Sequence, residues 1–129
     1  MAQKSAAKSL TDVIIKALKE KKGQNIVRMD LRNLSGAIVD YFVICTGTSD
    51  RHVSSLAETV VEKVKETLNE KPISKEGLRV GEWVLLDYVN VIVHVFQEEK
   101  RAFYAIEDLW GDAEIEEIKA ARPRLTKTK

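Results

Sequence analysis

The chain of 129 residues carries a formal net charge of +1, with 44% hydrophobic and 32% charged residues, which is typical of one soluble globular domain. This balance excludes a strong global field that would recruit nucleic acid or an acidic membrane. The single cysteine excludes an internal disulfide and suits a reducing compartment. No apolar run approaches the roughly 20 residues that a membrane helix needs. We therefore expect a cytoplasmic protein with one domain, residues 1–118, and a basic, disordered tail, residues 119–129.

Periodic apolar residues predict helices and strands in the order α-β-β-α-β-β-β-α. In chain order these occupy residues 9–22, 26–31, 41–46 and 53–68, then a short edge strand beginning at Ile73, then residues 83–88, 91–96 and 98–110. Ser9 and Asp12 resemble a capping box for the first helix, which Gly23 would end, while Gly111 would end the last helix. Because helices and strands alternate only partly, this order favours an α/β fold with a mixed sheet flanked by helices, and disfavours a doubly wound parallel sheet.

The most informative stretch, residues 81–96, reads as two strands with a tight connection near Val89-Asn90. Alternation divides the first strand into one face with Trp83, Leu85 and Asp87 and another with Val84, Leu86 and Tyr88. The second strand is apolar on nearly both faces. That pattern predicts a strand in the middle of a sheet with helices above and below it.

Isolated titratable residues offer little catalytic chemistry. Cys45 has no CxxC partner and no neighbouring base, so a buried structural thiol is favoured. His94 lies between two valines of a strand, where a core histidine is more frequent than a ligand or a catalytic base. His52 falls in the first turn of a helix, where a cation is mildly disfavoured. A metal site would require these three residues to converge, and no ligand spacing supports one. We expect no metal, no cofactor and no catalytic residues.

The turn Gly47-Thr48-Ser49 lies between a strand and a helix N-terminus, where backbone N–H groups can receive a phosphate. Some nucleotidyltransferases combine such a turn with two acidic residues that alternate on a nearby strand and hold Mg²⁺. Asp40 and Asp87 each lack the second carboxylate, and the adjacent Glu98 and Glu99 would point to opposite faces of a strand. Ordinary helix capping is therefore favoured, and a nucleotidyltransferase is kept as an alternative. Direct RNA binding is another alternative, although basic and aromatic residues are not interleaved as in RNA-binding strands.

Large aromatic residues are concentrated in two neighbouring predicted elements. They are Trp83, Phe103, Tyr104 and Trp110. They form either a shared core or, where exposed, a hot-spot patch rimmed by Asp87, Glu107 and Asp108.

Three blocks of sequence resemble the Iojap family of ribosomal silencing factors. They are DYFVICTGTSDRHV at residues 40–53, GEWVLLDY running into VIVHVF within residues 81–96, and RAFY with LWGDA within residues 101–113. These blocks in this order are hard to obtain by chance. One departure is clear, since the family usually has Gly-Asp where this chain has Val89-Asn90. Valine tolerates a positive φ badly, so we expect a longer or bulged turn at this point.

The resemblance implies a nucleotidyltransferase-like fold that lacks the catalytic carboxylates, and hence a protein that is not an enzyme. It implies binding to protein fourteen of the large ribosomal subunit, where the bound factor blocks joining of the small subunit and lowers translation, chiefly in starvation. It also implies a link to large-subunit maturation, and it leaves open a peripheral contact with ribosomal RNA and a homodimer of the free protein. Carried over by position, the partner surface comprises Trp83, Val84, Leu85, Asp87, Tyr88, Phe103, Tyr104 and Trp110.

Overall fold

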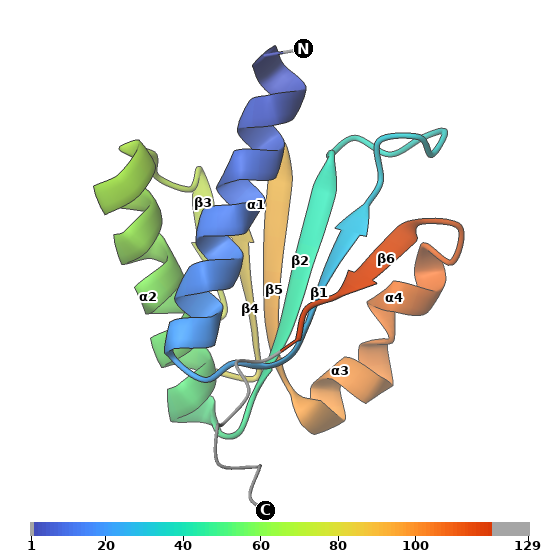
Figure 1. The fold of residues 1–129 in the computed structure, drawn as a ribbon. Coiled ribbons are helices and arrows are strands. Elements are labelled where there is room, and N and C mark those ends of the chain that lie inside the picture. The colour runs from blue at the N-terminus through green and yellow to red at the C-terminus, as the bar shows by residue number, and fades with distance from the viewer. Residues whose placement is uncertain (1, 120–129) are drawn as a thin grey trace, which may run out of the picture.

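A six-stranded mixed sheet forms the centre of the structure, with the strand order β3-β4-β5-β2-β1-β6 (Figure 1). The computed structural model describes the backbone of residues 2–119 and the side chains of residues 6–119. The helices are α1 (Ala2–Glu20), α2 (Asp50–Leu68), α3 (Glu98–Tyr104) and α4 (Ile106–Leu109), and the strands are β1 (Gln24–Asp30), β2 (Tyr41–Gly47), β3 (Ser74–Glu76), β4 (Trp83–Asp87), β5 (Val91–Gln97) and β6 (Glu114–Glu117). The predicted α/β fold with a mixed sheet flanked by helices is confirmed.

The parallel pair β2 and β5 occupies the middle of the sheet, and the other strand pairs are antiparallel. Every residue of β2 is buried, and most residues of β5 are buried as well. Strands covered on both faces need apolar side chains on both faces, which explains their nearly continuous hydrophobic sequences. The predicted central position of residues 91–96 is therefore confirmed.

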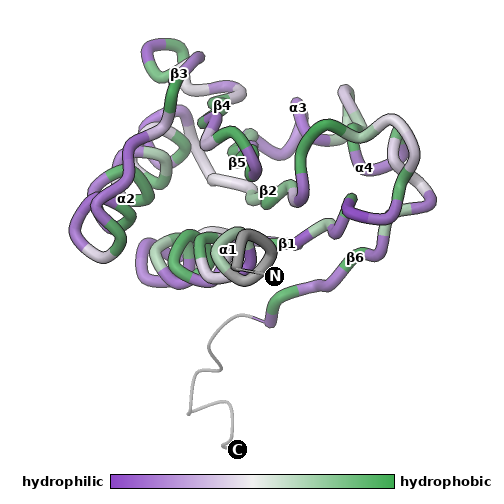
Figure 2. The backbone as a smooth tube through the Cα atoms, turned by 90° about the horizontal axis from the view of Figure 1, so that it is seen from above, coloured by the Kyte–Doolittle hydropathy of each residue, from purple (hydrophilic) through white to green (hydrophobic). Residues whose placement is uncertain are grey.

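Helices α1 and α2 cover one face of the sheet, and α3 and α4 lie on the other (Figure 2). The larger core lies beneath α1 and α2 and includes Ile14, Leu18, Leu56 and Val60. A second core lies on the α3 and α4 side and is built around Phe96. This second layer is thinner, because α3 and α4 are short and leave part of β4 and β5 uncovered by helix. None of the helices in the described part of the chain is long and apolar enough to span a bilayer.

The first helix is longer than its apolar stripe indicated. It begins at Ala2, so Ser9 lies within the helix and the predicted capping box there is wrong. Its last turn closes through Lys22, which adopts the left-handed φ of 63°, and the Gly23 amide donates to the Leu18 carbonyl at 2.8 Å. The helix thus ends where predicted, but Lys22 and not Gly23 takes the left-handed conformation, and Gly23 is needed because a Cβ at this position would collide with the Sγ of Cys45.

The region after β5 differs most from prediction. The single helix expected over residues 98–110 is two helices, separated at Ala105, which adopts a left-handed φ of 44°. Strand β6 was not predicted, because its sequence EIEE has no buried alternation and all four residues are exposed. It pairs along β1, and its Glu116 bonds the buried Arg28 at 2.7 Å. Three glutamates in an outer strand also protect a sheet edge against unwanted pairing. Of the tail predicted to be disordered, residues 120–129 lie outside the described residues.

The connection between β4 and β5 is tight, so the expected longer or bulged turn is wrong. The Tyr88 amide donates to the Val91 carbonyl, and the Asn90 amide donates to the Tyr88 carbonyl, both at 2.9 Å. Val89 lies between them with a φ of 77°, the strained γ-turn conformation. The side chain of Asp87 accepts from the Val89 amide at 2.8 Å and thereby stabilises the turn.

Candidate partner-binding face

The uncovered part of the α3 and α4 side of the sheet is an apolar surface that spans β4, β5 and α3. We call it the apolar face and define it as Trp83, Leu85, Ile92, Phe103 and Tyr104. The strand register aligns Trp83 with Phe96, Leu85 with His94 and Asp87 with Ile92. The three strand residues of the apolar face are half-buried, whereas Phe103 is 76% exposed and Tyr104 is 43% exposed.

A stack of aromatic rings supports this face from below. The ring of Trp83 contacts Phe96, at a centroid distance of 4.9 Å, and Tyr104, at 4.6 Å, and the latter two rings are 6.4 Å apart. Phe103 meets Tyr104 edge to face at 5.0 Å. Phe96 is fully buried, so the stack connects the sheet core to exposed rings on α3. Rings held in this way lose little conformational entropy when a partner binds.

His94 fixes the orientation of Trp83 from within the sheet. The indole Nε1–H of Trp83 donates to Nδ1 of His94 at 3.1 Å, which assigns the neutral imidazole proton to Nε2. Nε2 is buried and has no hydrogen-bond partner in the described structure. Burial lowers the pKa of His94 to about 4. His94 is therefore neutral near pH 7 and acts as a positioning residue for Trp83.

The structure divides the predicted partner residues into two groups. Trp83, Leu85, Phe103 and Tyr104 lie together on the apolar face, and Trp110 borders the same layer through an edge-to-face contact with Phe42 at 6.1 Å. Asp87 lies at the end of β4 on this side, with one oxygen engaged by the turn.

Val84 and Tyr88 do not belong to that surface. Both side chains are buried in the core beneath α1 and α2, because alternate residues of β4 point to opposite faces of the sheet. Their inclusion in the partner surface is corrected accordingly. Sequence reasoning also missed Ile92, although its alignment with Asp87 would have identified it once the strand register was known.

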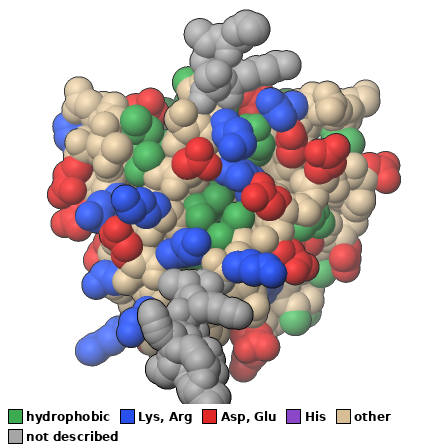
Figure 3. Space-filling view, in the orientation of Figure 1, with side chains coloured by type: hydrophobic (Ala, Val, Ile, Leu, Met, Phe, Trp, Pro, Cys, Tyr) green, Lys and Arg blue, Asp and Glu red, His purple; other side chains and the backbone are tan. Residues whose placement is uncertain are grey.

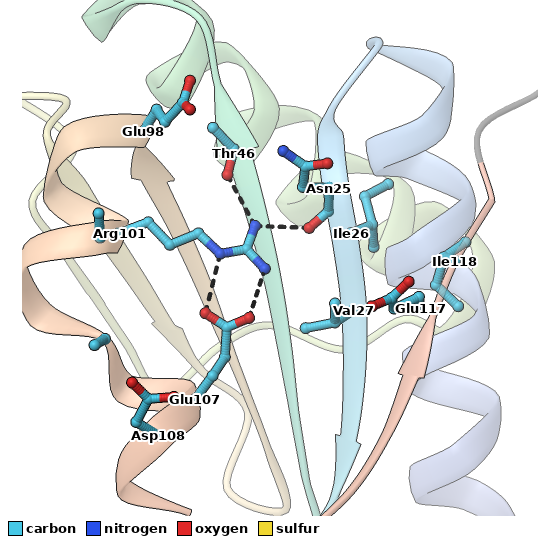
Figure 4. A pocket seen from close by; sticks show the side chains of 12 residues that line it. Asn25, Ile26, Val27, Thr46, Glu98, Arg101, Glu107, Asp108, Glu117 and Ile118 are labelled. Carbon is cyan, nitrogen blue, oxygen red and sulfur yellow. Dashed lines mark hydrogen bonds and ion pairs between the residues drawn. The ribbon is translucent and has the colours of Figure 1, made fainter. Parts of the chain in front are cut away.

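A polar hollow of about 580 Å³ lies next to this face, between α3, α4 and the ends of β1 and β2 (Figure 4). Arg101 crosses it and donates to both carboxylate oxygens of Glu107, at 3.1 and 2.9 Å. The same guanidinium donates to the Asn25 carbonyl at 2.6 Å and to Oγ1 of Thr46 at 2.8 Å. Arg101 thus ties α3 and α4 to the sheet across the break at Ala105, and this contact holds the exposed rings of α3 in place.

The turn between β2 and α2 serves to cap the helix. Oγ of Ser49 accepts from the His52 amide at 3.0 Å, and the Thr48 amide donates to Nδ1 of His52 at 2.8 Å. Nε2 of the same imidazole bonds the Lys21 carbonyl at 2.8 Å. The favoured prediction of helix capping is confirmed, since these groups are already occupied.

The remaining titratable candidates are structural within the described residues. Cys45 is fully buried, and burial raises the pKa of its thiol to about 12, as expected of a structural thiol. No group of three His, Cys, Asp or Glu side chains in residues 6–119 could hold a metal ion. On the α1 and α2 side of the molecule, Lys and Arg side chains are interspersed with Asp and Glu around a small apolar patch (Figure 3). That surface therefore lacks the uniform basic charge of a nucleic-acid footprint.

A family model described as ribosomal silencing factor during starvation matches residues 3–129. The chain belongs to this ribosomal silencing factor family. The ribosomal silencing factor RsfS of Bacillus subtilis is 35% identical over 112 residues, which cover 86% of this chain and 92% of that protein. The mouse protein named mitochondrial assembly of ribosomal large subunit protein 1 is 27% identical over 110 residues, covering 81% of this chain and 46% of that protein.

A crystal structure of a protein from Chromobacterium violaceum has a similar fold. It superposes with a TM-score of 0.77 at 35% identity, covering 91% of this chain and 97% of that one. The predicted family resemblance is thus confirmed. The silencing factor family consists of regulatory factors and not of enzymes, as the sequence predicted.

Proposed function

We propose that this silencing factor binds the large ribosomal subunit through large-subunit protein fourteen and prevents the small subunit from joining. A protein placed on the surface where the two subunits meet acts by steric exclusion and needs no catalytic group. Translation would fall as a result, chiefly in starvation. The name of the mouse relative supports a second role in large-subunit maturation. The proposal requires a cytoplasmic protein.

The observation that carries this proposal is the exposed aromatic surface in a member of the ribosomal silencing factor family. Single exposed hydrophobic residues are common, whereas a contiguous patch of them indicates an interaction site. Tyr104 contacts the rings of both Trp83 and Phe103, and Leu109 on the following helix is also 75% exposed. Preorganised aromatic residues of this kind form the energetic centres of protein interfaces.

The charges around the apolar face favour a basic protein as its partner. Residues 98–109, which form α3 and α4, contain four carboxylates and two basic residues, a net charge of −2. Ribosomal proteins that lie against RNA are rich in Lys and Arg, so an acidic rim steers such a partner and repels phosphate. Direct RNA binding through this face is therefore disfavoured, and any RNA contact would be peripheral.

We also propose that the fold is nucleotidyltransferase-like and catalytically inactive. The turn that could receive a phosphate is occupied by its own capping bonds around Ser49 and His52. Titration calorimetry with ATP, GTP, CTP and UTP in the presence of Mg²⁺ should therefore detect no specific binding. A micromolar Kd that Asp87→Asn or Asp40→Asn abolishes would overturn the assignment as a non-enzyme.

The proposed function is tested by the affinity of Trp83→Ala for purified large subunits. We expect a loss of about 2 kcal/mol, or about 30-fold in Kd, as for a buried interface aromatic. Because Trp83 also packs on Phe96, Tyr104→Ala provides a second variant with a smaller effect on folding. Val80→Ala, an exposed apolar residue beside the start of α2, is the matched control.

Subunit joining is measured in parallel by sedimentation of mixed large and small subunits. Wild-type protein and Val80→Ala should keep the subunits apart, while the two aromatic variants should allow them to join. Lower melting temperature with unchanged affinity of the folded fraction would assign Trp83 to the core alone. Absence of large-subunit binding by the wild-type protein would refute the proposal itself.

A further inference from the structure

The loop between β1 and β2 presents an isoleucine to solvent where its neighbours point inward. Leu34, Ala37 and Val39 pack against the second core, on the α3 and α4 side of the sheet. Ile38 lies between the last two and is 93% exposed. Because its side chain points to solvent, Ile38 adds no apolar contact to the core that holds this loop.

The turn at Val89 lies at the same end of the sheet. The Asn90 carbonyl accepts from the amides of Asp40 and Tyr41, at 2.8 and 3.2 Å, and so ties this turn to the end of the β1–β2 loop. Ile38 is two residues from that bond and Val89 is one residue from it. Two exposed β-branched side chains therefore lie at one end of the molecule.

Val89 is unfavourable for the free protein in two ways. It holds a φ of 77°, which strains a β-branched residue, and its side chain is 55% exposed. Glycine would remove both costs. Strain retained in this manner indicates a function for the residue outside the folding of the chain.

The apolar face continues directly toward this end. Asp87 and Ile92 form the last aligned pair of β4 and β5 before the turn, and Ile92 is aligned in turn with Phe42 at the start of β2. Asp40 and Asp87 lie at the same end, and Arg32 of the β1–β2 loop is paired there with Asp30, so this end stays acidic like the rim near α3. The surface thus keeps its apolar centre and acidic border along the length of β4 and β5.

We propose that Ile38 and Val89 extend the apolar face, and that the same basic protein of the large ribosomal subunit covers both. This inference rests on the proposed function. The occupant is the ribosomal partner because the extension is continuous with the apolar face and carries the same acidic border. A partner seated on both ends would contact the whole length of the β4–β5 hairpin.

The test uses Val89→Gly, which should make the protein more stable and its binding to the large subunit weaker. Relief of the positive φ should raise the melting temperature by about 3 °C, while loss of the side chain should weaken large-subunit binding about fivefold. Val89→Ala keeps the strain and removes most of the apolar surface, so its melting temperature should not rise although its affinity falls. Ile38→Ser should weaken binding about tenfold and leave the melting temperature unchanged.

Val80→Ser serves as the control, because it removes an exposed apolar residue beside α2, and it should change neither quantity. If Ile38→Ser and Val89→Gly bind within twofold of wild type while Trp83→Ala does not, the extension is refuted and the proposed function stands. A melting temperature of Val89→Gly at or below that of wild type would refute the strain at this turn. Failure of the wild-type protein to bind large subunits would instead remove the proposed function.

Discussion

Acid should destabilise this protein through His94 before it acts on most carboxylates. Burial lowers the pKa of His94 from its ordinary value of 6.5 to about 4. The fold therefore favours the neutral imidazole, and its contribution to stability is complete above pH 6.5 and is lost as the pH falls through 4. The difference between the two pKa values corresponds to roughly 3 kcal/mol, since one pH unit is worth about 1.4 kcal/mol. Protonation also removes the acceptor of the Trp83 indole.

Urea unfolding followed by tryptophan fluorescence between pH 7.5 and pH 4.5 measures this effect. The wild-type free energy of unfolding should fall by about 1.4 kcal/mol per pH unit below pH 6. His94→Gln retains an acceptor for Trp83 and does not titrate, so its stability should stay nearly flat between pH 6.5 and pH 5. If the free energy of unfolding changed equally with pH in the two proteins, burial would not hold His94 neutral. The assignment of a neutral His94 as the acceptor for the Trp83 indole would then be wrong.

Two further substitutions and one deletion test other parts of the chain, with Gly111→Ala as a control. Gly23→Ala should lower the free energy of unfolding by about 1–3 kcal/mol, since the added Cβ would collide with Cys45. Gly111→Ala introduces only ordinary contacts and should lower it less. Urea titration measures both variants, and equal losses would contradict the close approach at Gly23. Arg101→Lys removes the guanidinium that bonds both Glu107 on α4 and Thr46 on β2. Amide hydrogen exchange in α3 should therefore increase, and large-subunit binding should weaken. Unchanged exchange would refute the role of Arg101 in holding α3 and α4 on the sheet. Deletion of residues 119–129, which contain five basic residues, should shift the melting temperature by less than about 2 °C. It should weaken binding to the large subunit only at low salt. An equal loss of affinity at every salt concentration would show that these residues make specific contacts.

Elements with strong local periodicity could be predicted from the sequence. The apolar stripe of α2 and the alternation within β4 depend on residues a few positions apart, so the pattern is visible in the sequence itself. The central position of β5 followed from its apolar character on both faces. The aromatic residues Trp83, Phe103 and Tyr104, which the family resemblance singled out, lie together in the structure.

Features fixed by distant contacts could not be predicted in the same way. Strand β6 pairs through its backbone and through Glu116 with Arg28, 88 residues earlier in the chain. The break at Ala105 is held by Arg101, whose partners on β1 and β2 are far away in sequence. Alternation along β4 places Val84 and Tyr88 on one face of the sheet and Trp83 on the other. Both faces carry large apolar residues, so the sequence did not indicate which face α1 and α2 cover.

The most direct test of the proposed partner is a site-specific photo-crosslink from the apolar face. Phe103 is 76% exposed, so its replacement by photoreactive benzoylphenylalanine, whose ring system is also aromatic, should leave the fold intact. The modified protein is irradiated on purified large subunits, and the crosslinked product is identified by mass spectrometry, with the same probe at Val80 as the control. Our proposal predicts a crosslink to large-subunit protein fourteen from Phe103 and none from Val80. A crosslink from Phe103 to ribosomal RNA or to a different ribosomal protein would contradict it.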